Sequence, residues 1–284
     1  MDVKKNMEDF KRLEAVIPDM RKVMEYTGKD EVVSSYDAER HYLDHAPPLF
    51  SVKTGIITLD RMTEGFCNGE LITISGLTKH GKTTLAQTFT TNFGKQEINP
   101  VWFSYELPGR IFLKKFPKLP LFYLPLQMTE SGLKWIEAKI QESIVKYGSK
   151  AVFIDHLHYL VPMSAAVNMS LMIGAVMREL KKMTLKYNII IFIIAHTKKL
   201  SYNKKPDLDD IRDSSFISQE SDFVLMINRR TDEVIIDGEK EMIFTKEAKL
   251  FLLANRRNGN QGVIKLRHEN NTFFEIEKEN EEYK

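Results

Sequence analysis

The sequence predicts an α/β fold with a mostly parallel central sheet, and three of its features support this prediction. From residue 49 onward, short apolar segments alternate with longer segments of helical periodicity, the order expected when helices cover both faces of a parallel sheet. The segment 189–195 is apolar at every position, as is typical of a central strand buried on both faces. A glycine-rich loop at residues 76–83 joins a predicted strand to a predicted helix.

Residues 1–48 predict a helical arm and a linker that precede this domain. Apolar side chains recur at spacings of three and four in the arm, at Phe10, Leu13, Ile17, Met20 and Met24. Pro18 predicts a kink or the start of a second helix. Residues 27–48 are polar and end in two prolines, as is typical of a linker. We expect residues 49–276 to form one α/β domain and the charged residues 277–284 to form a solvated tail.

The elements of the domain follow from its periodicity. Strands are expected at residues 71–75, 101–104, 151–155, 189–195, 223–228 and 250–255. Helices are expected at residues 82–92, 131–147 and 168–187. The segment 116–125 contains three prolines and is expected to be a surface connection. Two short strands at residues 262–266 and 273–276 are expected to close the domain as a hairpin.

Composition limits the possible partners and the compartment. The 284 residues carry a formal net charge of +2, so any nucleic-acid contact must come from a local basic patch. Cys67 is the one cysteine, which excludes an internal disulfide and favours a reducing compartment. The sequence contains neither an apolar segment of about 20 residues nor a secretory signal. We expect a cytoplasmic protein that does not interact with membranes.

The loop Gly76-Leu-Thr-Lys-His-Gly-Lys-Thr83 has the phosphate-binding form GxxxxGK[ST], the Walker A or P-loop pattern. Glycines at both ends allow successive backbone N–H groups to face a phosphate, and the N-terminus of the following helix adds its positive dipole end. Lys82 is expected to reach the β- and γ-phosphates, and the Thr83 hydroxyl to ligate Mg²⁺. We therefore assign nucleoside triphosphate binding to Gly76, Lys79, His80, Gly81, Lys82, Thr83 and Thr84.

Three further residues end or follow predicted strands, at the edge of a parallel sheet where ligands bind. Asp155 is expected to hold a Mg²⁺-bound water and to complete the metal site with Thr83. Glu106 is the best candidate to polarise the attacking water; the alternative is an exposed glutamate at the start of the next helix. His196 is expected to sense the γ-phosphate, with a plain surface histidine as the alternative.

His156 and His158 form an H-x-H pattern around the end of the strand 151–155, but the sequence offers no further ligand nearby, so packing roles are expected. Basic residues follow His196, at Lys198, Lys199, Lys204, Lys205 and Arg212. Such a segment suits contacts with a nucleic-acid backbone without sequence preference. A solvated surface loop is the alternative.

Several motifs occur in the order typical of one family. The segment 54–65 matches TGxxxLDxxxxG, Phe103-Ser-Tyr-Glu106 is similar to FSLE, residues 209–222 are similar to DLRESGxIEQDAD, and Asn255-Arg-Arg-Asn-Gly259 is similar to KxRNG. From about residue 53 to 274, the chain resembles the motor domain of DnaB-type hexameric replicative helicases, which are RecA-like P-loop ATPases. Asn255 stands where the family has lysine, and Ser215 where it has glycine.

The resemblance implies a role for each matching residue. Lys82 matches the phosphate-binding lysine, Thr83 the metal hydroxyl, Asp155 the Mg²⁺ aspartate and Glu106 the catalytic glutamate. His196 matches the γ-phosphate sensor. Arg257 matches the arginine that completes a neighbouring subunit's ATP site. Alternation along a strand supports Arg257 over Arg256, because residues 255 and 257 share a face. The family's DNA-gripping loop matches the segment around Arg212.

The resemblance also implies a function: an ATP- and Mg²⁺-dependent DNA helicase that forms a ring, expected to be a hexamer, around single-stranded DNA. A primase or a helicase loader is an expected partner. The arm resembles the family's linker helix, which docks on the adjacent subunit; packing on its own domain is the alternative. About 50 residues precede the motor segment, so an N-terminal collar domain is expected to be absent. Two other functions stay open: a RecA-like ATPase without unwinding activity, recombinase-like or regulatory, and an ATP-dependent assembly or loading protein.

Overall fold

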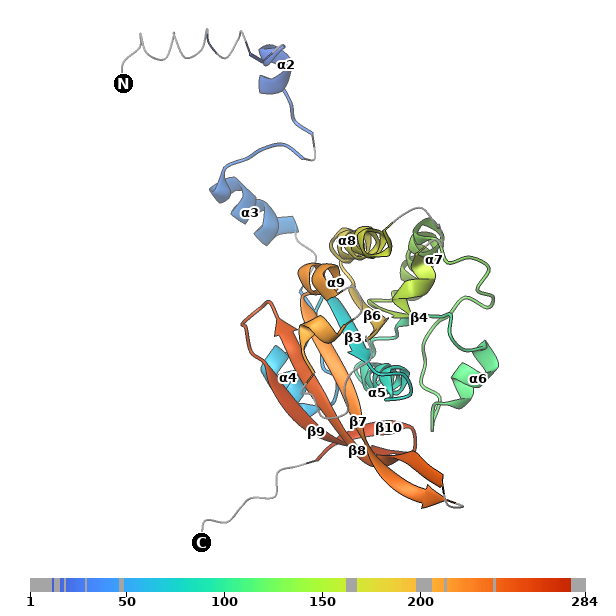
Figure 1. Cartoon of the computed structure of the whole chain (residues 1–284). Coiled ribbons are helices and arrows are strands. Elements are labelled where there is room, and N and C mark those ends of the chain that lie inside the picture. Colours follow the sequence, from blue (N-terminus) through green and yellow to red (C-terminus); the bar gives the residue numbers. More distant parts are fainter. Residues whose placement is uncertain are drawn as a thin grey trace. The chain divides into compact units, whose positions relative to one another are not determined.

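The computed structural model describes residues 12, 16–17, 19–28, 30–45, 49–161, 168–197, 206–211, 214–236 and 239–276 (Figure 1). The chain divides into two compact units, residues 1–48 and 49–284. The first unit contains helices α2 (Met20–Met24) and α3 (Ser35–His45). Ile17 lies outside a helix. Phe10, Leu13 and Pro18 of the predicted arm lie outside the described residues.

Helix α3 lies in the polar segment 27–48 that was predicted to be a linker, and no helix was predicted there. The Ser34 hydroxyl accepts a hydrogen bond from the backbone N–H of Asp37 at 3.1 Å, and the Ser34 carbonyl accepts from the N–H of Ala38 at 2.9 Å. A serine in this position caps a helix start. The local polar contacts form a helix that the apolar pattern did not reveal.

The second unit is built on an eight-stranded sheet with the strand order β10-β9-β8-β7-β3-β6-β5-β4 (Figure 1). Neighbours from β4 to β7 pair in parallel, and those from β7 to β10 pair antiparallel. The predicted α/β fold with a mostly parallel sheet is confirmed. The bounds are β3 (Leu71–Gly76), β4 (Val101–Ser104), β5 (Ala151–Asp155), β6 (Ile190–His196), β7 (Phe223–Ile236), β8 (Glu239–Asn255), β9 (Gly262–Glu269) and β10 (Thr272–Glu275). A separate small sheet pairs β1 (Ser51–Val52) with β2 (Phe66–Cys67).

Helices cover both faces of the large sheet, because alternate residues of its central strands are apolar on either side. In β6, Phe192 and Ile194 belong to the core cluster that contains side chains of α4 (Ile57–Thr63), α5 (Lys82–Gly94) and α6 (Gly109–Lys114). Ile191 and Ile193 belong to the other cluster. That second cluster contains side chains of α7 (Leu133–Tyr147), α8 (Met169–Tyr187) and α9 (Ser214–Glu220). Short 3₁₀ turns occur at Leu157–Leu160 and Leu208–Asp210.

The hairpin of β7 and β8 is much longer than predicted. The ladder continues past residue 228, through the pair Thr231 and Phe244, to the pair Ile236 and Glu239. Its outer part carries half-exposed apolar and charged side chains and lacks the apolar run used to predict a buried strand. Backbone pairing, which depends little on side-chain type, extends these strands.

The segment 116–125 has no helix, as predicted, and Phe116 and Phe122 bury their side chains in the core.

Within the parts of the chain that the structure describes, no helix combines the length and apolar character needed to cross a lipid bilayer.

Candidate nucleotide-binding site

The phosphate loop connects β3 to α5, and its two glycines are required by the local geometry. Gly76 has φ 151° and Gly81 has φ 95°. A Cβ atom at Gly76 would lie 2.4 Å from the carbonyl oxygen of Ile227, and one at Gly81 would lie 2.8 Å from the ring of Phe273. No larger residue fits either position without displacing its neighbours. Strands β7 and β10 therefore support the loop from outside.

All seven residues predicted to bind phosphates lie between the end of β3 and the first turn of α5. The Lys82 ammonium is buried and donates to the carbonyl oxygens of Gly76 at 3.0 Å and Leu77 at 3.1 Å. Burial lowers the pKa of Lys82, and the carboxylates of Asp155 and Glu106 oppose this shift. The positive charge of Lys82 is thus held directly beside the loop backbone.

Thr83 and Asp155 meet as the sequence predicts. The Thr83 hydroxyl donates to Oδ2 of Asp155 at 2.7 Å. Oδ1 of Asp155 is buried and has no hydrogen-bond partner among the described residues. Burial raises the pKa of Asp155 to about 6, while the Thr83 hydrogen bond opposes the shift. A buried carboxylate oxygen without a partner is unusual, and with the adjacent hydroxyl it forms the oxygen donor set that suits Mg²⁺.

Glu106 and His196 come together at the carboxyl edge of the sheet with His156, which the sequence did not assign to the site. Glu106 is exposed and lies between β4 and α6. His196 ends β6, and its ring centroid lies 4.2 Å from that of His156. The potential ligand atoms of the three residues lie within 4.8 Å of one another. Burial lowers the pKa of His156 to about 3, aided by the neighbouring imidazoles.

A contact between His80 and the long hairpin was also missed from the sequence. The backbone N–H of Arg229 donates to Nδ1 of His80 at 3.0 Å. The Arg229 side chain donates to the carbonyl oxygen of Thr245 at 2.8 Å and lies over the Phe244 ring at 4.9 Å. The phosphate loop and the hairpin thus share a hydrogen bond. No local motif signals it, because 149 residues separate His80 from Arg229.

Arg257 lies away from the phosphate loop of its own chain. Its guanidinium donates to the carbonyl oxygen of Gly65 at 3.1 Å and to that of Thr63, and pairs with Glu70. The alternation argument for choosing Arg257 over Arg256 is wrong, because β8 ends at Asn255 and a turn follows. The Asn255 side chain stabilises that turn by accepting from the Arg257 N–H at 3.1 Å.

The five predicted DNA-binding residues, Lys198, Lys199, Lys204, Lys205 and Arg212, lie outside the described residues. The described residues that flank the lysines are Thr197, just after β6, and Pro206. Thr197 and Ile211 pair as an isolated antiparallel bridge. Thr197, the last described residue before the lysines, thus lies next to His196 at the end of β6.

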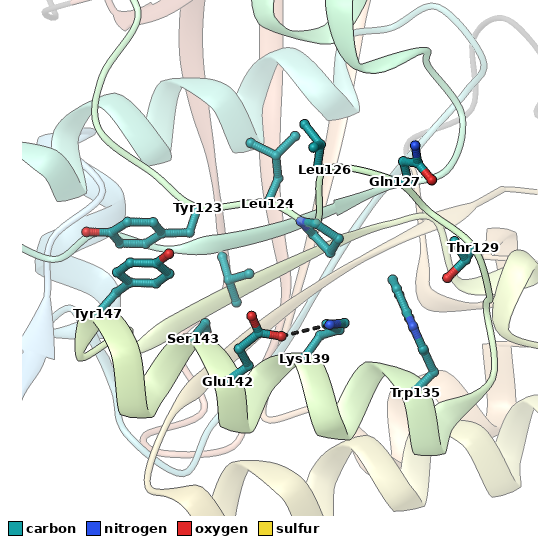
Figure 2. A pocket seen from close by; sticks show the side chains of 12 residues that line it. Tyr123, Leu124, Leu126, Gln127, Thr129, Trp135, Lys139, Glu142, Ser143 and Tyr147 are labelled. Atoms are coloured by element: carbon teal, nitrogen blue, oxygen red, sulfur yellow. Dashed lines mark hydrogen bonds and ion pairs between the residues drawn. The ribbon is translucent and has the colours of Figure 1, made fainter.

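A pocket lies at the amino end of β4, opposite to the end that Glu106 follows. It has a volume of about 450 Å³ and is lined by Val101, residues 123–127, Thr129 and one face of α7 (Figure 2). The rings of Tyr123 and Tyr147 stack with centroids 4.0 Å apart, and Lys139 pairs with Glu142 at 2.7 Å. Because Val101 begins β4 and Glu106 follows its end, the pocket is separate from the nucleotide site.

Comparisons with known proteins agree with this arrangement. Replicative DNA helicase DnaB of Treponema pallidum (strain Nichols) is 24% identical over 288 residues, which cover 90% of this chain and 59% of that protein. Replicative DNA helicase DnaC of Bacillus subtilis (strain 168) is 24% identical over 289 residues, which cover 88% and 62%. The chain thus spans about 60% of the length of the curated relatives it matches.

Solved structures share the fold. One solved ATPase domain superposes with a TM-score of 0.68 at 19% identity, covering 85% of this chain and 97% of that one. A DnaB-like replicative helicase, from a structure describing its interactions with primase, superposes with a TM-score of 0.70 at 19% identity, covering 95% and 75%. The family model for the DnaB-like helicase C-terminal domain matches residues 51–117 and 121–275. Because these residues make up most of the chain and include the phosphate loop and Asp155, the chain belongs to the DnaB-like helicase C-terminal domain family.

Proposed function

We propose that this chain is the motor of a replicative-type DNA helicase, which hydrolyses ATP with Mg²⁺ and acts as a ring, most simply a hexamer, on single-stranded DNA. The hydrogen bond between Thr83 and Asp155 beneath the phosphate loop carries the proposal. It joins the two residue types that hold the nucleotide-bound cation in P-loop ATPases. Such a motor would act in the cytoplasm.

The roles of the site residues follow from this arrangement. Lys82 would contact the β- and γ-phosphates, and Thr83 and Asp155 would hold Mg²⁺. The cation would neutralise charge on the phosphates, and the partnerless Oδ1 of Asp155 supports its fit to the site. Glu106 would polarise the attacking water, which its exposed position at the sheet edge permits. His196, at the end of β6, would contact the γ-phosphate.

Ring assembly supplies the parts that one protomer lacks. We propose that Arg257 completes the ATP site of a neighbouring protomer and that the helical arm around residues 10–24 docks on that neighbour. Lys198, Lys199, Lys204, Lys205 and Arg212 would hold the backbone of single-stranded DNA. The relatives are longer than this chain, and one solved relative is described with primase. A primase or a loader is therefore part of the proposal.

One observation favours an alternative, a RecA-like ATPase that does not unwind DNA. Arg257 is held by Glu70 and by two backbone carbonyls of its own protomer. To reach the ATP site of a neighbouring protomer, Arg257 must give up these contacts or add new ones when the ring assembles. If the pairing persists in the ring, turnover would be slow and the protein would act as a nucleotide-dependent switch or as an assembly factor.

A strand-displacement assay on a forked DNA substrate, run with ATP and Mg²⁺, separates these functions. The motor is expected to displace the strand. Glu106→Gln is expected to keep nucleotide binding and lose turnover by at least about 100-fold. Lys82→Ala serves as the control that loses nucleotide binding. DNA-stimulated hydrolysis without any displacement would instead favour the non-unwinding ATPase.

A further inference from the structure

Glu106, His156 and His196 form a cluster of potential metal ligands, and the proposed helicase mechanism assigns no metal to it. They follow or end β4, β5 and β6, which are adjacent in the sheet. The register aligns Ser104 with Asp155, so the chain leaves β4 and β5 at the same height. Sheet topology thus brings one carboxylate and two imidazoles from distant parts of the sequence to one edge.

The geometry of the cluster fits a small divalent cation. One ligand atom from each residue lies within 4.8 Å of the other two. Tetrahedral Zn²⁺ with bonds of about 2.1 Å separates its ligand atoms by about 3.4 Å. The ligand atoms must therefore move together by about 1.4 Å or less to reach the zinc spacing, and the exposed Glu106 side chain can move this far. The buried Nδ1 of His156 has no hydrogen-bond partner among the described residues, so it is available as a ligand atom.

The donor set distinguishes this site from the Mg²⁺ site at Thr83 and Asp155. Two imidazoles and one carboxylate hold the metal in several catalytic zinc sites, and imidazole suits zinc, copper, iron and nickel. Mg²⁺ prefers oxygen ligands and retains its waters. We propose that Glu106, His156 and His196 bind a first-row transition-metal ion, Zn²⁺ being the best match to these donors. In the sequence, His156 has no suitable further ligand nearby, and the fold brings Glu106 and His196 to it.

Occupation of this site has a consequence that rests on the proposed function. The Glu106 carboxylate cannot both ligate Zn²⁺ and polarise the attacking water. His196 cannot both ligate Zn²⁺ through the same nitrogen and contact the γ-phosphate. Zn²⁺ at low concentration is therefore expected to inhibit turnover in the presence of saturating Mg²⁺. The inhibition is expected to be reversed by a chelator that prefers Zn²⁺.

The test of the site itself needs no nucleotide and no turnover. The full chain is titrated with Co²⁺, which substitutes for Zn²⁺ and gives an intense visible absorption band in a tetrahedral site, and Zn²⁺ is then added as a competitor. We expect one equivalent of Co²⁺ to produce the band, Zn²⁺ to remove it and millimolar Mg²⁺ to leave it unchanged. His156→Gln and Glu106→Gln are each expected to weaken Co²⁺ binding by at least about tenfold.

His158→Gln is the matched control, because His158 belongs to the same motif and lies outside the trio; its ring centroid is 5.6 Å from that of His156. This variant is expected to keep the band. Since Glu106 is exposed, Glu106→Gln tests the site even if a histidine variant fails to fold. Absence of a Co²⁺ band in the wild-type chain, or its loss in His158→Gln but not in Glu106→Gln, would overturn the inference. Failure of unwinding with an intact Co²⁺ band would instead remove only the proposed function.

Discussion

The hydroxyl of Thr83 donates to Oδ2 of Asp155 at 2.7 Å and joins the start of α5 to the end of β5 across 72 residues of sequence. This bond connects the phosphate loop to the adjacent carboxylate. The second carboxylate oxygen of Asp155, Oδ1, is buried and has no partner among the described residues. Oδ1 of Asp155 is therefore an acceptor that a cation beside the Thr83 hydroxyl could satisfy.

Asp155→Asn is expected to abolish Mg²⁺-dependent turnover without destabilising the fold. The side chain keeps its shape and an oxygen that can accept the Thr83 hydrogen bond, but it loses the buried charge. Burial disfavours the charge of Asp155 more than the Thr83 hydrogen bond and the Lys82 charge favour it. Removing this buried charge relieves its desolvation cost, so the melting temperature without Mg²⁺ should be equal or higher. Thermal unfolding measures the effect on stability, and an ATPase assay measures the effect on turnover. A large drop in melting temperature would show that Asp155 is mainly structural.

Gly76→Ala is expected to destabilise the domain and to weaken nucleotide binding. The added Cβ would lie 2.4 Å from the Ile227 carbonyl oxygen, in a backbone conformation that L residues rarely adopt. The expected loss is at least about 1–3 kcal/mol of unfolding free energy, measured by urea denaturation. Gly132→Ala is the matched control, because nothing lies within 4 Å of the position that its Cβ would take and its φ is −70°. Equal stabilities of the two variants would contradict this prediction.

Stability is expected to fall as the pH decreases through the titration range of His80. Burial lowers the pKa of His80 in the folded chain, and its Nδ1 accepts from the Arg229 N–H. The unfolded chain therefore binds a proton at higher pH than the folded chain. The contribution of His80 is fully present above the unfolded pKa of about 6.5 and is lost as the pH falls toward the folded value.

His80→Asn isolates this effect, because asparagine can place an acceptor oxygen near the position of Nδ1 and does not titrate. Urea unfolding at pH 7.5 and 5.5 should show a smaller decrease in stability for His80→Asn than for the wild type. The same decrease in both proteins would assign the pH dependence to other groups.

Arg257→Ala is expected to abolish turnover while leaving nucleotide binding largely intact. An arginine supplied by a neighbour contributes about 10³–10⁵ in rate in related phosphoryl-transfer systems. The variant also loses the pairing with Glu70, so it should be destabilised by about 1–3 kcal/mol. Turnover per bound nucleotide is measured at a temperature where the variant is folded.

Glu70→Gln is the control for this variant. It breaks the same ion pair but keeps the arginine. We expect a similar loss of stability and retained or faster turnover, because Arg257 is then released for the neighbouring site. Unchanged turnover in Arg257→Ala would remove the intersubunit mechanism.

The sequence by itself determined the parts that depend on local pattern. The apolar run 189–195 predicted a strand buried on both faces, and the pattern between Gly76 and Thr83 predicted a loop that joins a strand to a helix, as the structure has it. Asp155 could be paired with Thr83 because residues that follow parallel strands lie at one edge of the sheet. These signals come from hydrophobic burial and from backbone geometry that only glycine permits, and both are visible in neighbouring residues.

The tertiary structure decided what depends on the order of strands in the sheet. Strand β3 lies between β6 and β7, and no periodicity in the sequence encodes this order. The cluster of Glu106, His156 and His196 and the contact between His80 and Arg229 both arise from it. The length of the hairpin of β7 and β8 depends on its backbone ladder. The pairing of Arg257 with Glu70 depends on the turn that follows β8. Such contacts join residues far apart in the chain, and their energies appear only once the whole sheet has formed.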